Sequence, residues 1–479
     1  MILRVINHPY EFDMKNLCIT FFPHEKIRLE GEEDPVVVTT RRETDGSFFV
    51  SAKVYDVYRE ATANPEPADE EHLVLSVTLY RLLSGILGFA PPWGVLYGVR
   101  PAKLMHRLCA QMGDDAAVAH FQTAFLTQKS KAELAHEVML HENRSIARSG
   151  PKSFSLYVSI PFCPTRCAYC SFVSHSIEKT HKLMTPYVDL LLRELEETAK
   201  YAKELGLELA TVYFGGGTPT TLSAQDLGRI FSTIEQNFDL SHLLEYTVEA
   251  GRPDTVTRER LEVIRAAGVQ RISINPQSFN DKVLEAIGRR HTAQQTLDAF
   301  ALARDCGFDH INMDFIAGLP EDDLPSFQRS IQTALDLQAE SITVHTLALK
   351  TSAYMVTREQ TFDLKDRLTV SNMVDYAGQT LHGAGYYPYY MYRQSKSLGN
   401  LENVGWCKPG YDCLYNVYMM DETHTVLAVG AGAVTKLRGQ NSGMIERIYN
   451  YKYPYEYIRD FDTLLERKKR IPGFYAEYD

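Results

Sequence analysis

Strand-like and helix-like segments alternate six times between Tyr157 and His345, and this alternation restricts the fold more than any other feature of the sequence. Neighbouring parallel strands need a crossover connection of a dozen or more residues, usually a helix. The alternation therefore predicts a parallel sheet that closes into a full or partial barrel. The predicted strands, which are apolar and rich in β-branched residues, are 155–160, 210–214, 245–250, 271–275, 310–316 and 341–345.

Amphipathic segments lie between these strands, and the clearest are 187–205, 257–267 and 324–337. Apolar residues in 187–205 repeat at the spacing of one helix face. Because proline suits the start of a helix, we expect Pro186 to lie in the first turn, and we expect Glu194 to face away from the apolar side.

Residues with chemical character follow the predicted strands. A three-cysteine segment, 163–170, follows the first strand, the glycine-rich segment 215–219 follows the second, and Glu249 ends the third. Enzymes with such barrels have their active sites at the carboxyl ends of the strands, so we expect one face of the barrel to hold them all. The residues near the later strand ends are Asn275, Gln277, Asp314 and Ala348.

The chain has 479 residues, which is too long for one ordinary core, and the flanks of the predicted barrel have other patterns. We predict an N-terminal α+β accessory domain over 1–150, the barrel over 151–350, and a C-terminal α+β domain over 351–479 that covers the substrate. The predicted elements of the flanks are strands in 36–58 with a turn at Asp45-Gly46, helices in 81–89, 100–112, 115–147 and 366–382, and a strand in 425–434.

Composition excludes several classes of protein. The net charge of −11 argues against nucleic-acid binding, which needs clustered cations. The N-terminus lacks the pattern of a signal peptide, and no apolar run reaches the roughly 20 residues of a membrane span. Eight scattered cysteines in so long a chain do not suggest disulfides, so we expect a reducing cytoplasm. Outside 163–170, buried thiols are the expected state of Cys18, Cys109, Cys306, Cys407 and Cys413.

The segment FCPTRCAYCSF holds Cys163, Cys167 and Cys170, and three thiols are an unusual number. A structural zinc site has four ligands and a disulfide has two. An iron–sulfur cubane is usually held by four thiolates, so three would leave one iron open to an external ligand. A zinc site that lacks a ligand, or three surface thiols, are the alternatives.

The ordered motifs resemble one family. LYVSIPFCPTRCAYCSF, YFGGGTPT, TVEAGRP, RISINPQSFN with IGRRH, and NMDFIAGLP are similar to the oxygen-independent coproporphyrinogen III oxidase (coproporphyrinogen dehydrogenase) family of radical SAM proteins. The likeness covers about 155–350 and extends to GAGAV near 430, and PPWGVLYGVRP resembles the longer HemZ-type subgroup. It implies a partial (β/α)6 TIM-like barrel, a 4Fe–4S cluster, and one or two molecules of S-adenosylmethionine.

The resemblance also implies roles for single residues. The cluster ligands would be Cys163, Cys167 and Cys170. The cluster-bound S-adenosylmethionine would contact Tyr157, Gly216, Glu249 and Val434, of which Tyr157 and Glu249 are the catalytic candidates. A second S-adenosylmethionine would contact Tyr169, Gly217, Thr218, Gln277, Arg289, Asp314 and Ala348. The alternatives are a tight turn for the glycines, a solvated carboxylate for Glu249, and a solvated pair for Arg289 and Arg290.

The implied substrate is a tetrapyrrole, and the implied reaction is decarboxylation of coproporphyrinogen III to protoporphyrinogen IX, with electrons from a flavodoxin or ferredoxin. Phe172 departs from the best-understood oxidases, which have a further cysteine there, and the related haem-chaperone branch shares this Phe. A haem chaperone and an anaerobic haem-methylating, ring-opening enzyme are therefore the alternatives. GYYPYYMYRQS could supply aromatic faces, with Arg393 and Lys396 for propionates. A histidine could bind haem iron, and His291 and His345 lie nearest the expected cleft.

Overall fold

The main element of the computed structural model is a sheet of eleven strands within the described residues, which are 1–479 except 24, 99, 171–174, 349–363 and 395. Seven neighbouring strands run parallel, in the order β12-β11-β10-β9-β8-β5-β15. The first six of these in space are the six predicted strands, so the predicted barrel is confirmed. They are β5 (Ser153–Ile160), β8 (Glu208–Gly216), β9 (Glu245–Glu249), β10 (Arg271–Ser273), β11 (Ile311–Ala317) and β12 (Ser341–Thr346).

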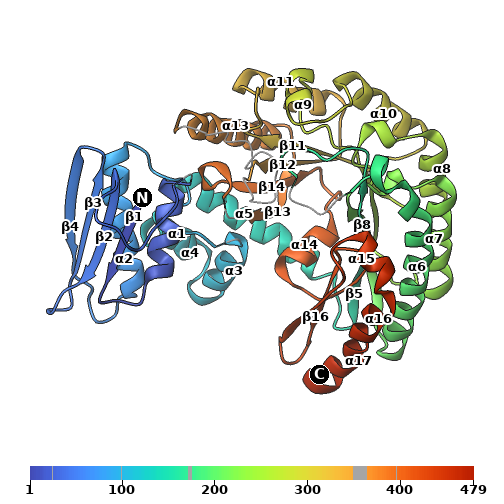
Figure 1. Cartoon of the computed structure of the whole chain (residues 1–479), viewed down its shortest axis with the longest axis horizontal. Coiled ribbons are helices and arrows are strands. Elements are labelled where there is room, and N and C mark those ends of the chain that lie inside the picture. The colour runs from blue at the N-terminus through green and yellow to red at the C-terminus, as the bar shows by residue number, and fades with distance from the viewer. Residues whose placement is uncertain (24, 99, 171–174, 349–363, 395) are drawn as a thin grey trace.

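Helices cover the outer face of this sheet, as the curved row on the right of Figure 1 shows. Apolar residues of α7 at helical spacing, such as Leu227, Ile230 and Ile234, are fully buried, and Ser223 caps this helix by accepting from the Asp226 amide. The outer helices are α6 (Ile177–Glu204), α7 (Ala224–Asn237), α8 (Arg258–Ala266), α9 (Asp281–Ala286), α10 (Ala293–Asp305) and α11 (Leu324–Asp336).

Two predictions for α6 are wrong. The helix begins at Ile177, so Pro186 lies in its interior instead of its first turn. Glu194 is fully buried and not solvated. Its carboxylate forms an ion pair of 2.7 Å with Lys468, which is also fully buried. The sequence around Glu194 could not reveal this, because Lys468 comes from the far end of the chain.

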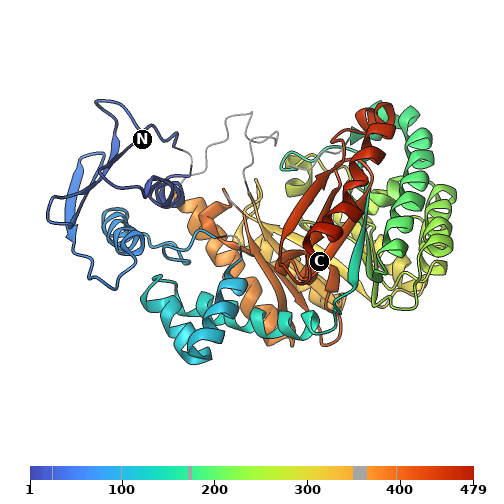
Figure 2. The ribbon, with the colours of Figure 1, turned by 90° about the horizontal axis from the view of Figure 1, so that it is seen from below.

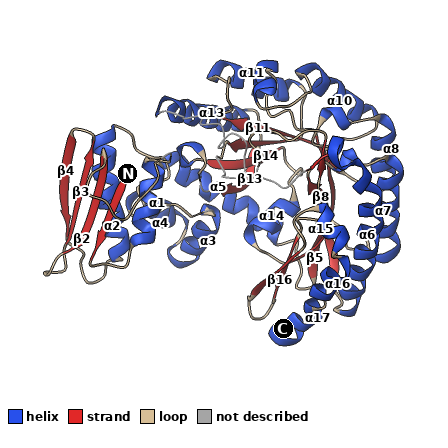
Figure 3. Ribbon diagram, viewed as in Figure 1, coloured by secondary structure: helices blue, strands red, loops and turns tan. Residues whose placement is uncertain are grey.

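The N-terminal region has a four-stranded sheet of its own, on the left of Figure 1, and Figure 3 shows α1 and α2 against it. The predicted turn at Asp45-Gly46 joins β2 and β3. Buried apolar residues between Met1 and Val95, except Trp93, form a separate core. Trp93 and the buried apolar residues of the next three helices join the core of the barrel. The elements are β1 (Ile2–Ile6), α1 (Glu11–Phe21), β2 (Val36–Arg42), β3 (Phe48–Val54), β4 (Val57–Ala63), α2 (Glu71–Leu87), α3 (Pro101–Met112), α4 (Asp114–Thr123) and α5 (Lys129–Ile146).

The helix predicted over 115–147 is two helices, because Leu126 between α4 and α5 adopts a positive φ of 55°, which an α-helix excludes. The domain boundaries at 150 and 350 stay predictions. No helix of the described residues is long and apolar enough to cross a membrane.

The C-terminal segment extends the barrel sheet at both edges, and Figure 2 shows its strands, coloured orange and red, beside the barrel. β15 pairs in parallel with β5, which the sequence did not predict. The strand predicted over 425–434 breaks at Gly430, where φ is +92° and a Cβ would lie 2.4 Å from the Ser159 carbonyl oxygen. The elements are α13 (Leu364–Gly383), β13 (Tyr387–Arg393), β14 (Glu402–Cys407), α14 (Leu414–Asp421), β15 (Thr425–Val429), β16 (Val434–Arg438), β17 (Ile445–Tyr449), α15 (Pro454–Arg459), α16 (Phe461–Lys468) and α17 (Arg470–Tyr478).

Candidate functional site

The cysteine segment follows β5 at the carboxyl edge of the sheet, as predicted. Cys163 ends the short strand β6 (Phe162–Cys163), which pairs with β7 (His175–Ser176). The Ala168 amide donates to the Ile287 carbonyl at 2.9 Å, and the Cys170 amide donates to the Cys167 carbonyl at 3.1 Å. Backbone hydrogen bonds therefore shape this loop and join it to the loop after α9.

The glycine segment packs directly against the cysteine segment. The amides of Gly217 and Thr218 donate to the carbonyls of Ile160 and Phe162 at 2.7 and 2.8 Å. A Cβ on Gly217 would lie 2.6 Å from the Phe162 oxygen and 3.0 Å from the Cys163 sulfur. Glycine is needed here because two backbone segments and a thiol meet, so the segment is more than a tight turn. Gly216 has φ +103°, and η1 (Pro219–Thr221) follows.

Glu249 lies at the end of β9 and accepts a hydrogen bond of 2.6 Å from the Tyr213 hydroxyl. Burial raises the pKa of Glu249 to about 7, although the Tyr213 hydrogen bond opposes the rise, and the charge of Asp314 adds to it. The ring of Tyr213 stacks on Tyr415 at 4.4 Å and on Tyr157 at 6.2 Å. Tyr157 and Glu249, the catalytic candidates, thus meet through one stack of tyrosines inside the barrel.

Asp314 lies on β11, two strands from β9 in the sheet. Asn312 donates to its Oδ1 at 2.7 Å, and His345 Nε2 lies 3.8 Å from its Oδ2. Burial would raise the pKa of Asp314, but His345 and Asn312 lower it on balance. Gln277 is buried with φ +66° and bridges to β11, since its amide donates to the Asp314 carbonyl at 2.9 Å.

Arg289 and Arg290 have different environments. Arg289 donates to the Asn275 carbonyl at 2.7 Å and to the Tyr169 hydroxyl at 3.1 Å, so its guanidinium is held beside the cysteine loop. Arg290 is exposed and pairs with Glu178. The solvated pair that was the alternative for both therefore applies to Arg290 alone.

The remaining two predicted residues lie at strand ends. Ala348, after β12, forms a bridge with Ser397, and Val434 begins β16 opposite Tyr449. Both are half-buried. Their contacts to a cofactor stay predictions, as do those of the other site residues.

Several polar atoms at this edge are buried and have no hydrogen-bond partner among the described residues. Ser273 ends β10, Asn275 follows two residues later, and each has one such atom, as does Arg289. Buried polar groups are nearly always satisfied in native proteins, so a group of them indicates a bound polar ligand or ordered water. Three thiols, a glycine cradle and a polar interior fit an iron–sulfur cluster with a polar organic cofactor.

Two residues of this edge were not predicted from the sequence. Tyr415 reaches the tyrosine stack from α14. Arg252 lies in the motif TVEAGRP, and its Nη1 lies 3.8 Å from the Cys167 sulfur. A buried arginine so close to the cysteine loop could have been suspected from that motif, whereas nothing local marks Tyr415.

The residues predicted to lie near the tetrapyrrole have different environments. Arg393 is buried and donates to the carbonyls of Leu96 and Asn400, so its interpretation as a propionate contact is wrong. Tyr389 and Tyr390 are buried core residues. Phe172 lies outside the described residues. His291 is buried, and neither ring nitrogen has a partner among the described residues.

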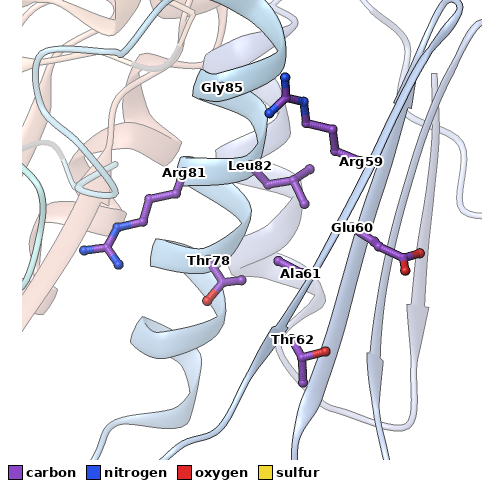
Figure 4. A pocket seen from close by; sticks show the side chains of 8 residues that line it. All are labelled: Arg59, Glu60, Ala61, Thr62, Thr78, Arg81, Leu82 and Gly85. Carbon is purple, nitrogen blue, oxygen red and sulfur yellow. The ribbon is translucent and has the colours of Figure 1, made fainter.

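The other cysteines are mostly buried. Cys18, Cys407 and Cys413 are buried as expected, whereas Cys109 and Cys306 are half-buried, so the expectation of buried thiols is wrong for these two. Cys109 lies beside Asp114, which pairs with His136 at 3.0 Å. The pocket in Figure 4 lies elsewhere, between β4 and α2 of the N-terminal region.

Comparisons with known proteins identify the family of the chain. Residues 157–334 match the radical SAM superfamily. The oxygen-independent coproporphyrinogen-III oxidase-like protein HemZ of Bacillus subtilis is 34% identical over 95% of this chain and 94% of its own length. The chain belongs to this radical SAM family.

Members of the radical SAM superfamily bind a 4Fe–4S cluster and S-adenosylmethionine, and these are the cofactors of the chain. The haem chaperone HemW of Escherichia coli is 30% identical over 63% of this chain and 74% of its own length. The coproporphyrinogen III oxidase HemN of Escherichia coli has a similar structure, with a TM-score of 0.50 and 22% identity over 68% of this chain and 72% of that chain. This likeness shows the radical SAM fold, a partial TIM barrel.

Proposed function

We propose that the protein is a radical SAM oxidoreductase that decarboxylates coproporphyrinogen III to protoporphyrinogen IX. The observation that carries the proposal is the likeness to the coproporphyrinogen-III oxidase-like HemZ over nearly the whole of both chains. The similarity to haem chaperones covers about two thirds of this chain.

In this proposal the three cysteines hold the cluster, and the glycine segment admits S-adenosylmethionine close to it. When bound, the cluster and S-adenosylmethionine together supply a carbon radical that abstracts hydrogen. Arg289 can form an ion pair with a carboxylate of the cofactor, and Asp314 can accept hydrogen bonds from its ribose hydroxyl groups. Glu249 can hold or release a proton near neutral pH, since its pKa lies at about 7. The tyrosine stack excludes water from the interior, which a reactive carbon radical requires.

The overall change at each propionate is balanced. The β-carbon loses one hydrogen atom, the carboxylate leaves as carbon dioxide, and one electron passes to an acceptor as the vinyl group forms. Two such rounds give the product. The electron for the cluster would come from a flavodoxin or ferredoxin.

The test is an anaerobic assay of the full chain after reconstitution with iron and sulfide. S-adenosylmethionine, dithionite and coproporphyrinogen III are added, and chromatography follows protoporphyrin, after oxidation, and 5′-deoxyadenosine. We expect the wild-type chain to form protoporphyrin and 5′-deoxyadenosine. Cys167→Ser should form neither product, whereas Cys306→Ser, which lies outside the motif, should form both.

A haem chaperone is the second candidate, because the HemW relatives and Phe172 favour it. It predicts a stable complex on titration with haem and no decarboxylated product. Deoxyadenosine that forms at the same rate with and without the porphyrinogen would count against the oxidoreductase.

A further inference from the structure

Cys167 has a permanent positive charge beside its sulfur. Arg252 Nη1 donates to the Cys167 Sγ at 3.8 Å. The Cys163 Sγ lies 3.5 Å from the hydroxyl of Thr218. An arginine side chain does not lose its proton in a protein, so this charge is present at every working pH.

The surrounding structure holds Arg252 in one place. Its Nε and Nη2 donate to the two carboxylate oxygens of Asp254 at 3.0 and 2.9 Å, and its Nη1 also donates to the Thr165 hydroxyl at 3.1 Å. Its side chain is 3% exposed. The short helix η2 (Pro253–Thr255) keeps Asp254 beside it, because the Thr255 amide donates to the Arg252 carbonyl. Water therefore screens little of its field at the sulfur.

We propose that Arg252 is a positioning residue that raises the reduction potential of the 4Fe–4S cluster, and that Asp254 limits this rise. Reduction adds one negative charge to a cluster that three thiolates already make negative. A guanidinium that donates to one of these thiolates stabilises the added charge, since hydrogen bonds and net charge around the sulfurs set cluster potentials. The Asp254 carboxylate offsets part of the same charge. Arg252 and Asp254 together thus determine how low the potential of a reductant must be to reduce the cluster.

The two members of the pair predict shifts of opposite sign. The full chain is reconstituted anaerobically, its iron and sulfide are counted, and its midpoint potential is measured by a titration followed by electron paramagnetic resonance. We expect a lower potential for Arg252→Gln, a smaller decrease for Arg252→Lys, and a higher potential for Asp254→Asn. Arg290→Gln, which changes an exposed arginine paired with Glu178, is the control and leaves the potential unchanged.

An unchanged or higher potential in Arg252→Gln would overturn the proposal, and so would a lower one in Asp254→Asn. If Arg252→Gln alone fails to hold iron, the sign of the shift in Asp254→Asn decides. If neither variant holds four irons, the pair serves cluster assembly and the proposal is wrong. No tetrapyrrole is present, so the outcome is independent of the proposed reaction.

Discussion

Two glutamates of the barrel have opposite surroundings: Glu194 is fully buried, and Glu249 is half-buried. Glu194 on α6 accepts from the Gly430 amide, the Asn450 amide group and the Tyr457 hydroxyl, and it pairs with Lys468. Glu249 at the end of β9 accepts one hydrogen bond from a described residue, Tyr213. The described residues thus give the first carboxylate four partners and the second carboxylate one.

The difference separates structure from function. A buried charge with a complete set of partners holds elements together, here α6 and the C-terminal segment, and it has no capacity left for a ligand. A carboxylate whose ionised form is disfavoured by burial, like that of Glu249, is typical of functional sites. Four variants of the chain without its cluster test this contrast.

The largest effect is expected when Lys468 is replaced by Met. Glu194 then stays buried without its cation. The Ala428 carbonyl and the Thr198 hydroxyl also lose the hydrogen bonds that Lys468 donates to them. Removal of one member of a buried ion pair costs about 3–5 kcal/mol. Anaerobic urea unfolding measures the loss, and a decrease below about 1 kcal/mol would show that the pair is not structural.

Replacement of Glu249 by Gln is expected to stabilise the chain, but only at higher pH. The pKa of Glu249 in the folded chain, about 7, lies above the usual glutamate value of 4.5. Protonated Glu249 therefore favours the folded state below about pH 4.5, and this advantage is lost as the pH rises to about 7. The variant should match the wild type at pH 4.5 and exceed it by roughly 1–3 kcal/mol at pH 8. If the free energies of unfolding of the variant and the wild type differed by the same amount at every pH, the raised pKa of Glu249 would be contradicted.

Replacement of Tyr213 by Phe should sharpen the contrast with a smaller effect. Its hydroxyl donates to Glu249 and lowers the pKa of that carboxyl. Loss of the hydrogen bond costs about 1 kcal/mol and shifts the pH window of the stability decrease upward. Tyr246→Phe is the matched control, since its buried hydroxyl has no partner among the described residues. An equal shift in both variants would contradict the role of Tyr213.

The smallest effect is expected for Lys200→Met. Lys200 also pairs with a glutamate at 2.6 Å, but on the exposed surface of α6. Exposed pairs are screened by water, so the urea midpoint should stay unchanged. A decrease as large as that of Lys468→Met would show that distance, and not burial, determines the effect.

The strand–helix alternation predicted six of the seven parallel strands, because apolar periodicity is a local property of sequence. It missed β15, whose partner β5 lies far away in the chain. The motifs placed the cysteine and glycine segments correctly at the carboxyl edge. The surroundings of Glu194 and the place of Tyr415 in the tyrosine stack could not be predicted, because the contacts join segments that are remote in the chain.

By itself the sequence determined the order of the barrel strands, the three thiols and the glycines that let two backbones and a sulfur meet, since each depends on neighbours in the chain. Only the tertiary structure decided which buried charges are satisfied. Glu194 pairs with Lys468 because the C-terminal segment folds back along the barrel, whereas Glu249 accepts, among the described residues, from Tyr213 on the neighbouring strand β8. Burial and partner number, which set the charge and reactivity of a carboxylate, are properties of the packed molecule.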